Sequence, residues 1–178
     1  MSTEAQESSS LKLDSVEGSC HCGAVRFTVK DVDLSNITKC NCSVCVKDGS
    51  TMTKVPGQSL LLKDMDGTSA PFTYSDNLDG HDSQMRNTNL STYRFNLDNP
   101  NFMIFRHFCN HCGIPVFVTA FSQAHGGALA SININSLDLE KAGIDRALIT
   151  RPEKMVYIDG KEDLFKTQQG QPWSHGAW

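Results

Sequence analysis

The sequence contains no long apolar run and no signal of secretion. None of its stretches approaches the ~18 consecutive apolar residues that a membrane-spanning helix requires. Its start, MSTEAQESSS, lacks the basic segment and apolar stretch of a secretory signal peptide. We therefore expect a cytoplasmic protein with no membrane partner.

An excess of positive charge is also missing. The formal net charge is −4 at pH 7, and the isoelectric point is about 5.8. Proteins that bind nucleic acids present a basic face to the phosphates, so we expect no nucleic-acid partner. No internal repeat is visible, and 178 residues are enough for one domain with a sizeable core.

Composition divides the chain into three parts. Residues 1–15 are polar and Ser-rich, which predicts a disordered N-terminal lead-in. Residues 16–165 form the expected domain, interrupted at 76–91 by an exposed loop rich in Asp, Asn and Ser. Residues 166–178 form a tail that holds both tryptophans of the chain, and we expect this tail to pack on the domain. A homodimer contact is the alternative use of these aromatic side chains.

Alternation of apolar and polar residues predicts a mainly β fold. The segment AVRFTVK at 24–30 alternates in this way, as a half-buried strand requires. One short helix is predicted at 136–143, where Ser136 would cap the start and Gly143 would end the helix. Further short strands are predicted at 59–63, 71–75, 92–97, 102–108, 115–121, 128–134 and 155–159.

Seven cysteines are many for a chain of this length, and four of them form two close pairs. In a reducing compartment, clustered cysteines are more often metal ligands or catalytic thiols than disulfides. Cys20 and Cys22 are two positions apart, which places both thiols on one face of an extended backbone. Cys109 and Cys112 precede Gly113, which suits a tight metal-binding turn. Joined across the fold, these four cysteines would form the closed set of a structural zinc site.

The stretch KCNCSVCVKDG at 39–49 holds the other three cysteines, Cys40, Cys42 and Cys45. Three protein ligands with one open position are typical of a catalytic zinc. An iron–sulfur cluster is an alternative, although no run here has a ferredoxin spacing. A fourth ligand from elsewhere would instead close the site, and the candidates are His21, His81, His107, His111 and Asp48.

Three strings occur in a fixed order along the chain: GSCHCGAVRF, KCNCSVCVKDGS and RHFCNHCGIPVF. In this order the chain resembles the glutathione-dependent formaldehyde-activating (Gfa-like) family, which includes centromere-protein-V-type proteins, from about Gly18 to about Leu164. The resemblance implies a β-tent fold of small twisted antiparallel sheets around two zinc sites. It also implies that the four-cysteine set holds a structural zinc and that the three-cysteine set holds a second, exchangeable zinc where the chemistry takes place.

Three thiolates and one zinc dication sum to a charge of −1, so this ion would be a weaker Lewis acid than a zinc held by neutral histidines. Such a soft site suits a sulfur ligand in the fourth position, since the metal holds a thiol as the nucleophilic thiolate. We therefore expect a carbon–sulfur lyase or synthase that forms or cleaves an adduct of a glutathione-like thiol and an aldehyde, or acts on a thioether. The residues expected to carry the chemistry are Cys40, Cys42, Cys45 and Lys47, with Asp48, His81 and His107 as further candidates for proton transfer.

Glutathione would also need cations for its carboxylates. The available cations are Arg86, Arg94, Arg106, Lys47 and Lys54. Two other functions stay open at this point. One is a non-enzymatic, zinc-stabilised interaction module, and the other is a lyase or hydrolase of a larger reactive metabolite, with the 76–91 loop and the C-terminal aromatic residues around its pocket.

Overall fold

The computed structural model describes residues 11–64, 66–72, 88–95, 102–122, 127–161 and 166–174. Most of the loop expected at 76–91, with the candidates His81 and Arg86, lies outside these ranges, as does Trp178. Within the described part of the chain, the helices are too short to cross a membrane.

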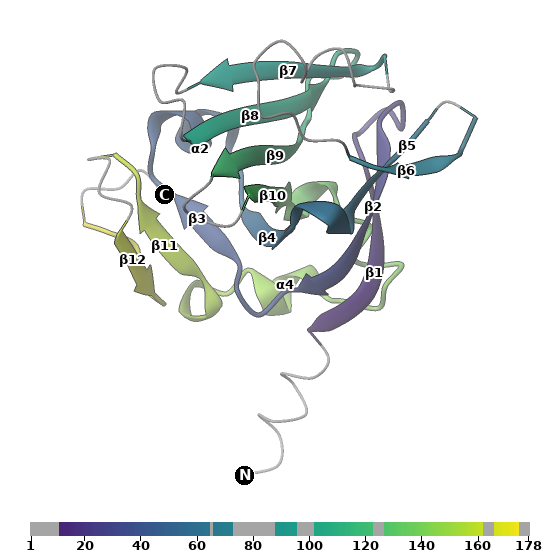
Figure 1. The fold of residues 1–178 in the computed structure, drawn as a ribbon. Coiled ribbons are helices and arrows are strands. Elements are labelled where there is room, and N and C mark those ends of the chain that lie inside the picture. The colour runs from purple at the N-terminus through teal and green to yellow at the C-terminus, as the bar shows by residue number, and fades with distance from the viewer. Residues whose placement is uncertain are drawn as a thin grey trace.

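The fold is mainly β, as predicted, and the described strands form two sheets (Figure 1). The smaller sheet has four antiparallel strands in the order β1-β2-β5-β6. These strands are β1 (Lys12–Ser19), β2 (Arg26–Asp33), β5 (Leu60–Lys63) and β6 (Ser69–Pro71). Strand β1 thus begins inside the segment expected to be a disordered lead-in, because its backbone pairs with β2 from Lys12 onward.

The larger sheet has eight strands in the order β12-β11-β3-β4-β10-β9-β8-β7. All neighbours are antiparallel except β3 and β11, which run parallel. The strands are β3 (Thr38–Cys40), β4 (Met52–Pro56), β7 (Leu90–Phe95), β8 (Phe102–Cys109), β9 (Pro115–Ser122), β10 (Gly127–Asn133), β11 (Val156–Asp159) and β12 (Lys166–Gln169).

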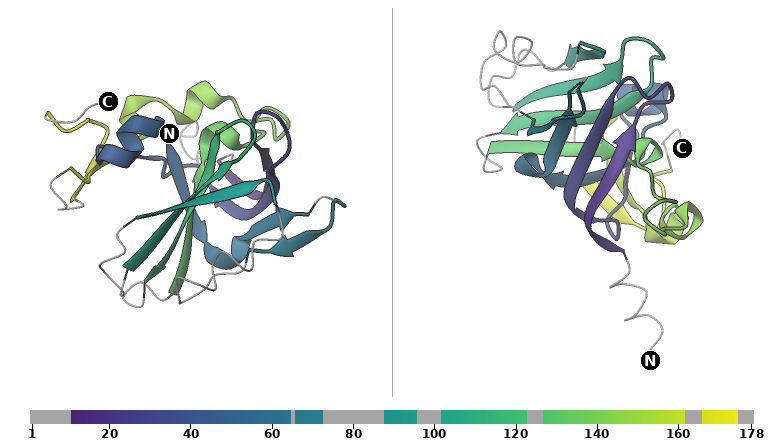
Figure 2. Two further views of the ribbon diagram at one scale, coloured as in Figure 1. Left: turned by 90° about the horizontal axis from the view of Figure 1, so that it is seen from above. Right: turned by 90° about the vertical axis from the view of Figure 1, so that its right-hand side faces the viewer.

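The core lies between the two sheets, which pack face to face in Figure 2. Phe27 of β2 and Phe117 of β9 are both buried, and their rings meet edge to face with centroids 5.5 Å apart. Phe72 completes the contact on the Phe117 ring. The alternation predicted for β2 is therefore confirmed, because Phe27 and Val29 face this core while Arg26 and Lys30 are exposed.

The helix predicted at 136–143 is wrong. A 3-10 turn, η3 (Ile134–Ser136), is followed by contacts with the end of β1 and then by turns at 139–143. Leu137 forms an isolated bridge with Gly18, and the Asp138 N–H donates to the Glu17 carbonyl over 2.8 Å. These long-range hydrogen bonds occupy groups that a helix would use, and they allow Leu137 and Leu139 to be buried together.

The described residues contain two short α-helices instead, α2 (Ser43–Asp48) and α4 (Arg146–Ile149). Of the other described 3-10 turns, η1 (Gly57–Ser59) joins β4 to β5, and η4 (Pro152–Lys154) lies between α4 and β11. In the tail, the indole N–H of Trp173 donates to the Tyr157 carbonyl over 3.3 Å, and its ring packs against the core.

Replacing Gly18 with Ala is expected to destabilise the fold. A Cβ at this position would lie 2.5 Å from a Phe27 ring carbon and 2.7 Å from the Ser136 carbonyl oxygen, so the ring or the η3 turn must move. Overpacking of this kind costs about 1–3 kcal/mol. Denaturant unfolding of Gly18→Ala beside Ser15→Ala, an exposed position on the same strand, checks the loss, and equal stability of the two variants would contradict the packing described here.

Candidate metal centres

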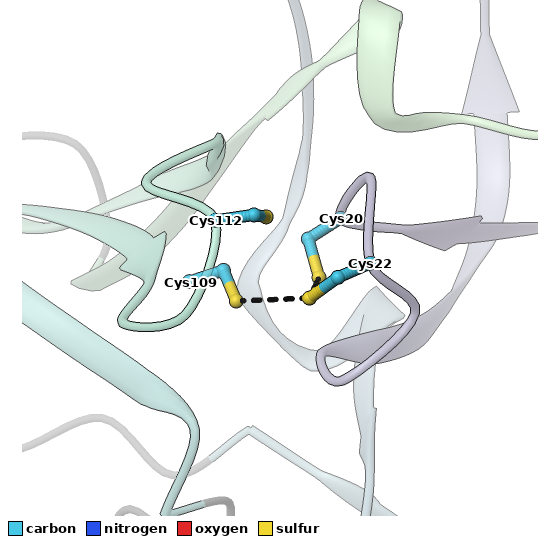
Figure 3. Close-up of side chains that lie close together, drawn as sticks. All are labelled: Cys20, Cys22, Cys109 and Cys112. Atoms are coloured by element: carbon cyan, nitrogen blue, oxygen red, sulfur yellow. Dashed lines mark hydrogen bonds between the residues drawn. The ribbon is translucent and has the colours of Figure 1, made fainter.

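The first cysteine cluster brings together two segments that are distant in the sequence. The four sulfurs of Cys20, Cys22, Cys109 and Cys112 all lie within 4.8 Å of one another. In Figure 3 the two pairs face each other from separate loops, with the Cys22 sulfur 3.6 Å from that of Cys20 and 3.7 Å from that of Cys109. The structure therefore confirms that the two cysteine pairs come together, and the four residues form a group that could hold a metal ion.

The loop after β1 is shaped around its two cysteines. The Cys20 N–H donates to the Val25 carbonyl and the Gly23 N–H donates to the Cys20 carbonyl, both over 3.0 Å. Gly23 follows Cys22 with a φ of +75°, a conformation that side-chain-bearing residues rarely adopt. The Val25 N–H lies 3.2 Å from the Cys20 sulfur, which accepts its hydrogen bond.

The turn between β8 and β9 repeats this arrangement. The Cys109 N–H donates to the Ile114 carbonyl over 3.1 Å, and the Gly113 N–H donates to the Cys109 carbonyl over 2.9 Å. Gly113 follows Cys112 with a φ of +73°. In both turns the first cysteine bonds to a residue five positions ahead and accepts from the glycine N–H, so the two turns present their sulfurs to a common point in a similar way.

The environments of Cys109 and Cys112 act on their thiols in opposite directions. Burial raises the pKa of the Cys109 thiol to about 12. Burial also acts upward on Cys112, but hydrogen bonds from the backbone amides of Cys22 and Ile114 outweigh it and lower the pKa of Cys112 to about 6. Amide groups that point at sulfur stabilise thiolates, and four thiolates at this spacing fit the donor set of tetrahedral zinc.

The second cluster is local in sequence. Cys40 ends β3, Cys42 directly precedes α2, and Cys45 lies within that helix, so a strand-to-helix turn places the three sulfurs within 4.8 Å of one another. All three residues are half-buried. Gly49 ends α2 in the left-handed conformation, with a φ of +66°, and its N–H bonds to the Cys45 carbonyl.

The end of β11 and the residues directly after it contact this turn through hydrogen bonds and close packing. The Asn41 side chain donates to the buried Asp159 carboxylate over 2.9 Å and accepts the Lys161 N–H over 2.8 Å. Gly160 lies directly against the cysteines, since a Cβ there would come within 2.6 Å of the Cys40 sulfur and 2.9 Å of the Cys42 Cβ. No sequence motif indicated Asn41 or Gly160, because their role depends on the parallel pairing of β11 with β3.

The three thiols of this cluster shift the pKa values of one another. Hydrogen bonds with Cys40 and Cys45, together with the nearby amides of Cys45 and Val44, lower the pKa of Cys42 to about 2. The thiols of Cys40 and Cys42 raise the pKa of Cys45, and the Cys42 thiol raises that of Cys40. Metal binding at such a cluster releases protons, because every sulfur ligand must be a thiolate.

Arg106 of β8 also reaches this cluster. Its Nη2 lies 3.3 Å from the Cys45 sulfur, and its Nη1 donates to Ser50 Oγ over 2.9 Å and forms an ion pair with Asp48. Arg106 is only 6 % exposed. From the sequence, Arg106 was a candidate cation for a substrate carboxylate, but the structure places it beside the Cys45 sulfur instead.

Within the described residues, no histidine or carboxylate joins the three-cysteine cluster as a fourth ligand. Asp48 pairs with Arg106, and His111 is exposed and hydrogen-bonds Asn89 over 2.8 Å. His21 is exposed in the loop of the first cluster, and His81 lies outside the described residues.

His107 is a core residue. It is fully buried, and its two ring nitrogens lie 3.0 Å from Thr92 Oγ1 and 2.9 Å from Thr119 Oγ1. It follows Arg106 on β8, and successive side chains of a strand point to opposite faces. Its ring meets Phe72 and Phe117 between the sheets, so its surroundings favour packing over proton transfer.

The other candidate cations are spread over the surface. Lys47 is exposed on α2 and Lys54 on β4, while Arg94 is half-buried on β7. None of them lines the cavity of about 590 Å³ that the described residues form between the first cluster and the end of α2. Residues around this cavity include Cys20, His21, Asp48, Pro115, Asn135 and Lys141. Lys141 is a cavity cation that no sequence motif indicated.

Comparison with known proteins finds similar sequences. The chain is 30% identical over 103 residues to a protein of Halomonas elongata named "Putative glutathione-dependent formaldehyde-activating enzyme". The predicted resemblance to the Gfa-like family is confirmed. The match covers 58% of this chain and 55% of the relative, so the chain spans about half the length of the family protein it matches. No family model matches the chain, and no solved structure does.

Replacing Gly160 with Ala is expected to weaken metal binding at the three-cysteine cluster alone. The added methyl group would displace the Cys40 sulfur. None of the atoms nearest to this methyl group belongs to the four-cysteine cluster. Metal content after dialysis against a chelator measures the effect, with the exposed neighbour Lys161→Ala as control. Metal retention equal to that of the control would contradict the close approach of Gly160 to Cys40.

Proposed function

We propose that the protein is a zinc-dependent carbon–sulfur lyase or synthase that forms or cleaves the adduct of a thiol and an aldehyde at Cys40, Cys42 and Cys45. One observation carries the proposal. The three sulfurs converge, are half-buried, and lack a fourth protein ligand among the described residues. The four-cysteine cluster has the closed donor set of a structural zinc, so the two clusters would have different roles.

The donor set fits zinc at both clusters, because close thiolates are its preferred soft ligands. At the three-cysteine cluster a bound zinc would supply an open position that holds an incoming thiol as its nucleophilic thiolate.

The bond changes balance without an added oxidant or reductant. In the forward direction, the sulfur of the thiol forms a bond with the aldehyde carbon, and the π electrons of the carbonyl move to its oxygen. The proton lost from the thiol ends on that oxygen, which gives a hydroxyl group. In the reverse direction the carbon–sulfur bond breaks, and thiol and aldehyde are released.

The residues of the chain would orient and exchange protons around this step. Asn41 and Gly160 hold the turn that presents Cys40 and Cys42. Lys47 is exposed on α2, two positions after Cys45, and its ammonium group is our candidate for giving the proton to the carbonyl oxygen. Asp48 is less suited to this task because it is paired with Arg106.

The substrate class rests on two further observations. The cavity of about 590 Å³ lies within the range of ~300–1,000 Å³ typical of small-molecule sites, and it reaches Asp48 at the end of α2, although none of the three cysteines lines it. The relative from Halomonas elongata is named for a glutathione-dependent activity. Lys141 in the cavity wall has a largely exposed side chain and would meet a carboxylate of a glutathione-like thiol, although it also pairs with Asp138.

Two zinc ions are expected in the purified protein, with unequal retention. A chelator should remove the ion at the three-cysteine cluster while the fold persists, because that site is half-exposed and has only three protein ligands. Removal of the ion at the four-cysteine cluster should unfold the domain, since the ligands of this ion join two segments that are distant in the sequence. Metal analysis alongside circular dichroism during a chelator titration measures both steps. Equal resistance of both ions would favour the non-enzymatic module.

Replacing Cys42 with Ala is expected to abolish activity and preserve the fold, whereas replacing Cys112 with Ala is expected to destabilise the protein. The physical reason is that the Cys112 pair ties β8 and β9 to the loop after β1, while Cys42 belongs to a local turn. Activity is measured with a panel of thiols and aldehydes, scored for adduct formation and breakdown, and stability by thermal unfolding. If both variants unfold alike, the division of roles between the clusters is wrong.

A further inference from the structure

Arg106 is a buried cation with three partners in one short segment. It lies on β8 and contacts Cys45 Sγ, the Asp48 carboxylate and Ser50 Oγ. A buried guanidinium is strongly unfavourable unless it is paired and hydrogen-bonded. The three partners lie between Cys45 and Ser50, within α2 or in the turn that follows it.

These contacts fix the turn that carries the last cysteine. Asp48 Oδ1 accepts the Ser50 N–H over 2.9 Å, and the same N–H lies 3.3 Å from the Cys45 carbonyl. Nη1 of Arg106 then binds the side chains of both Asp48 and Ser50, which leaves Nη2 directed at the Cys45 sulfur. The position of that sulfur is therefore set from outside the three-cysteine segment.

The charges favour the same role. Three thiolates and a dication would sum to −1 at this cluster, and a cation in contact with one thiolate stabilises the charged form of that sulfur. Asp48 balances the guanidinium on its other side. Without Arg106, Asp48 would keep its hydrogen bond from the Ser50 N–H but lose its ion-pair partner, and the Cys45 sulfur would lose its contact with a cation.

We propose that Arg106 is the positioning residue of the three-cysteine site. It orients the Cys45 sulfur and offsets its charge, and thereby sets the metal affinity of this site independently of the four-cysteine site. Side chains that hydrogen-bond a metal ligand typically change metal affinity by 10–100-fold when they are replaced. The inference rests on the proposed function only in requiring a metal at Cys40, Cys42 and Cys45.

The test compares zinc affinity at the two clusters by competition with chelators of graded strength. Arg106→Met should lower the affinity of the three-cysteine site by about 10–100-fold, and Arg106→Lys should give a smaller loss, because an ammonium group keeps the charge but reaches fewer acceptors. Lys30→Met, which removes an exposed charge on β2, is the control for net charge. In a Cys42→Ala background, which retains only the four-cysteine site, Arg106→Met should leave zinc affinity unchanged.

A second variant separates this role from a purely structural one. Arg106→Met with Asp48→Asn removes both members of the ion pair, so no unpaired carboxylate is buried and the fold is preserved even if the single variant is unstable. The double variant should still bind zinc more weakly than the wild type, and cobalt bound in its place should show an altered thiolate-to-cobalt absorption. Wild-type affinity in the double variant would overturn the proposal, because Arg106 would then serve only to pair with Asp48.

The outcomes also distinguish the two proposals. If the wild-type protein processes thiol–aldehyde adducts but the Arg106 variants bind zinc as tightly as the wild type, the role of Arg106 is overturned and the proposed function stands. If the Arg106 variants bind zinc more weakly but the wild-type protein processes no adduct, the role of Arg106 stands and the proposed function is overturned. A wild type that holds zinc only at the four-cysteine cluster would overturn both.

Discussion

The structure depends on the meeting of two cysteine turns that are far apart in the sequence. One turn follows β1 of the smaller sheet, and the other joins β8 to β9 of the larger sheet. A metal ion held by their four sulfurs would tie the two sheets together at one edge of the core. Beside it, Gly18 allows the Phe27 ring to approach the backbone closely, so the sheets pack tightly next to the cluster.

Strand β8 connects this cluster to the second one. It ends in Cys109, a sulfur of the first cluster, and three positions earlier it carries Arg106, which contacts Cys45 of the second. Between them, His107 faces the opposite side and packs in the core. The same strand therefore secures the four-cysteine cluster, fills the core and supports the three-cysteine cluster, so a closed site could stabilise the framework on which an open site is presented.

Sequence reasoning predicted what is encoded locally. Alternation located β2, and cysteine spacing gave the composition of both clusters before their distances were known. It failed where long-range pairing decides the structure. The segment from Ser136 to Gly143 has helix signals, but hydrogen bonds to the end of β1 hold it in turns. Strands β3 and β4 were also missed, because β3 has only three residues, all half-buried, and β4 begins with two buried residues before it alternates.

The residues that support the three-cysteine site could not be identified from the sequence either. In FMIFRHF the arginine resembles the exposed polar residue of a strand, yet Arg106 is buried because α2 and its following turn cover it with three acceptors. Gly160 and Asn41 acquire their roles only when β11 lies parallel to β3. Such contacts join residues more than 50 positions apart, and no local pattern indicates them.

The central claim is that the three-cysteine cluster holds a metal with one position left for a ligand from solution. A crystal structure of the zinc-loaded protein with a bound thiol, with zinc located by its anomalous scattering, tests this claim most directly. The account predicts zinc bound by the sulfurs of Cys40, Cys42 and Cys45 and by the sulfur of the added thiol. A fourth ligand supplied by an imidazole or carboxylate of the same chain, with the thiol excluded, would contradict it.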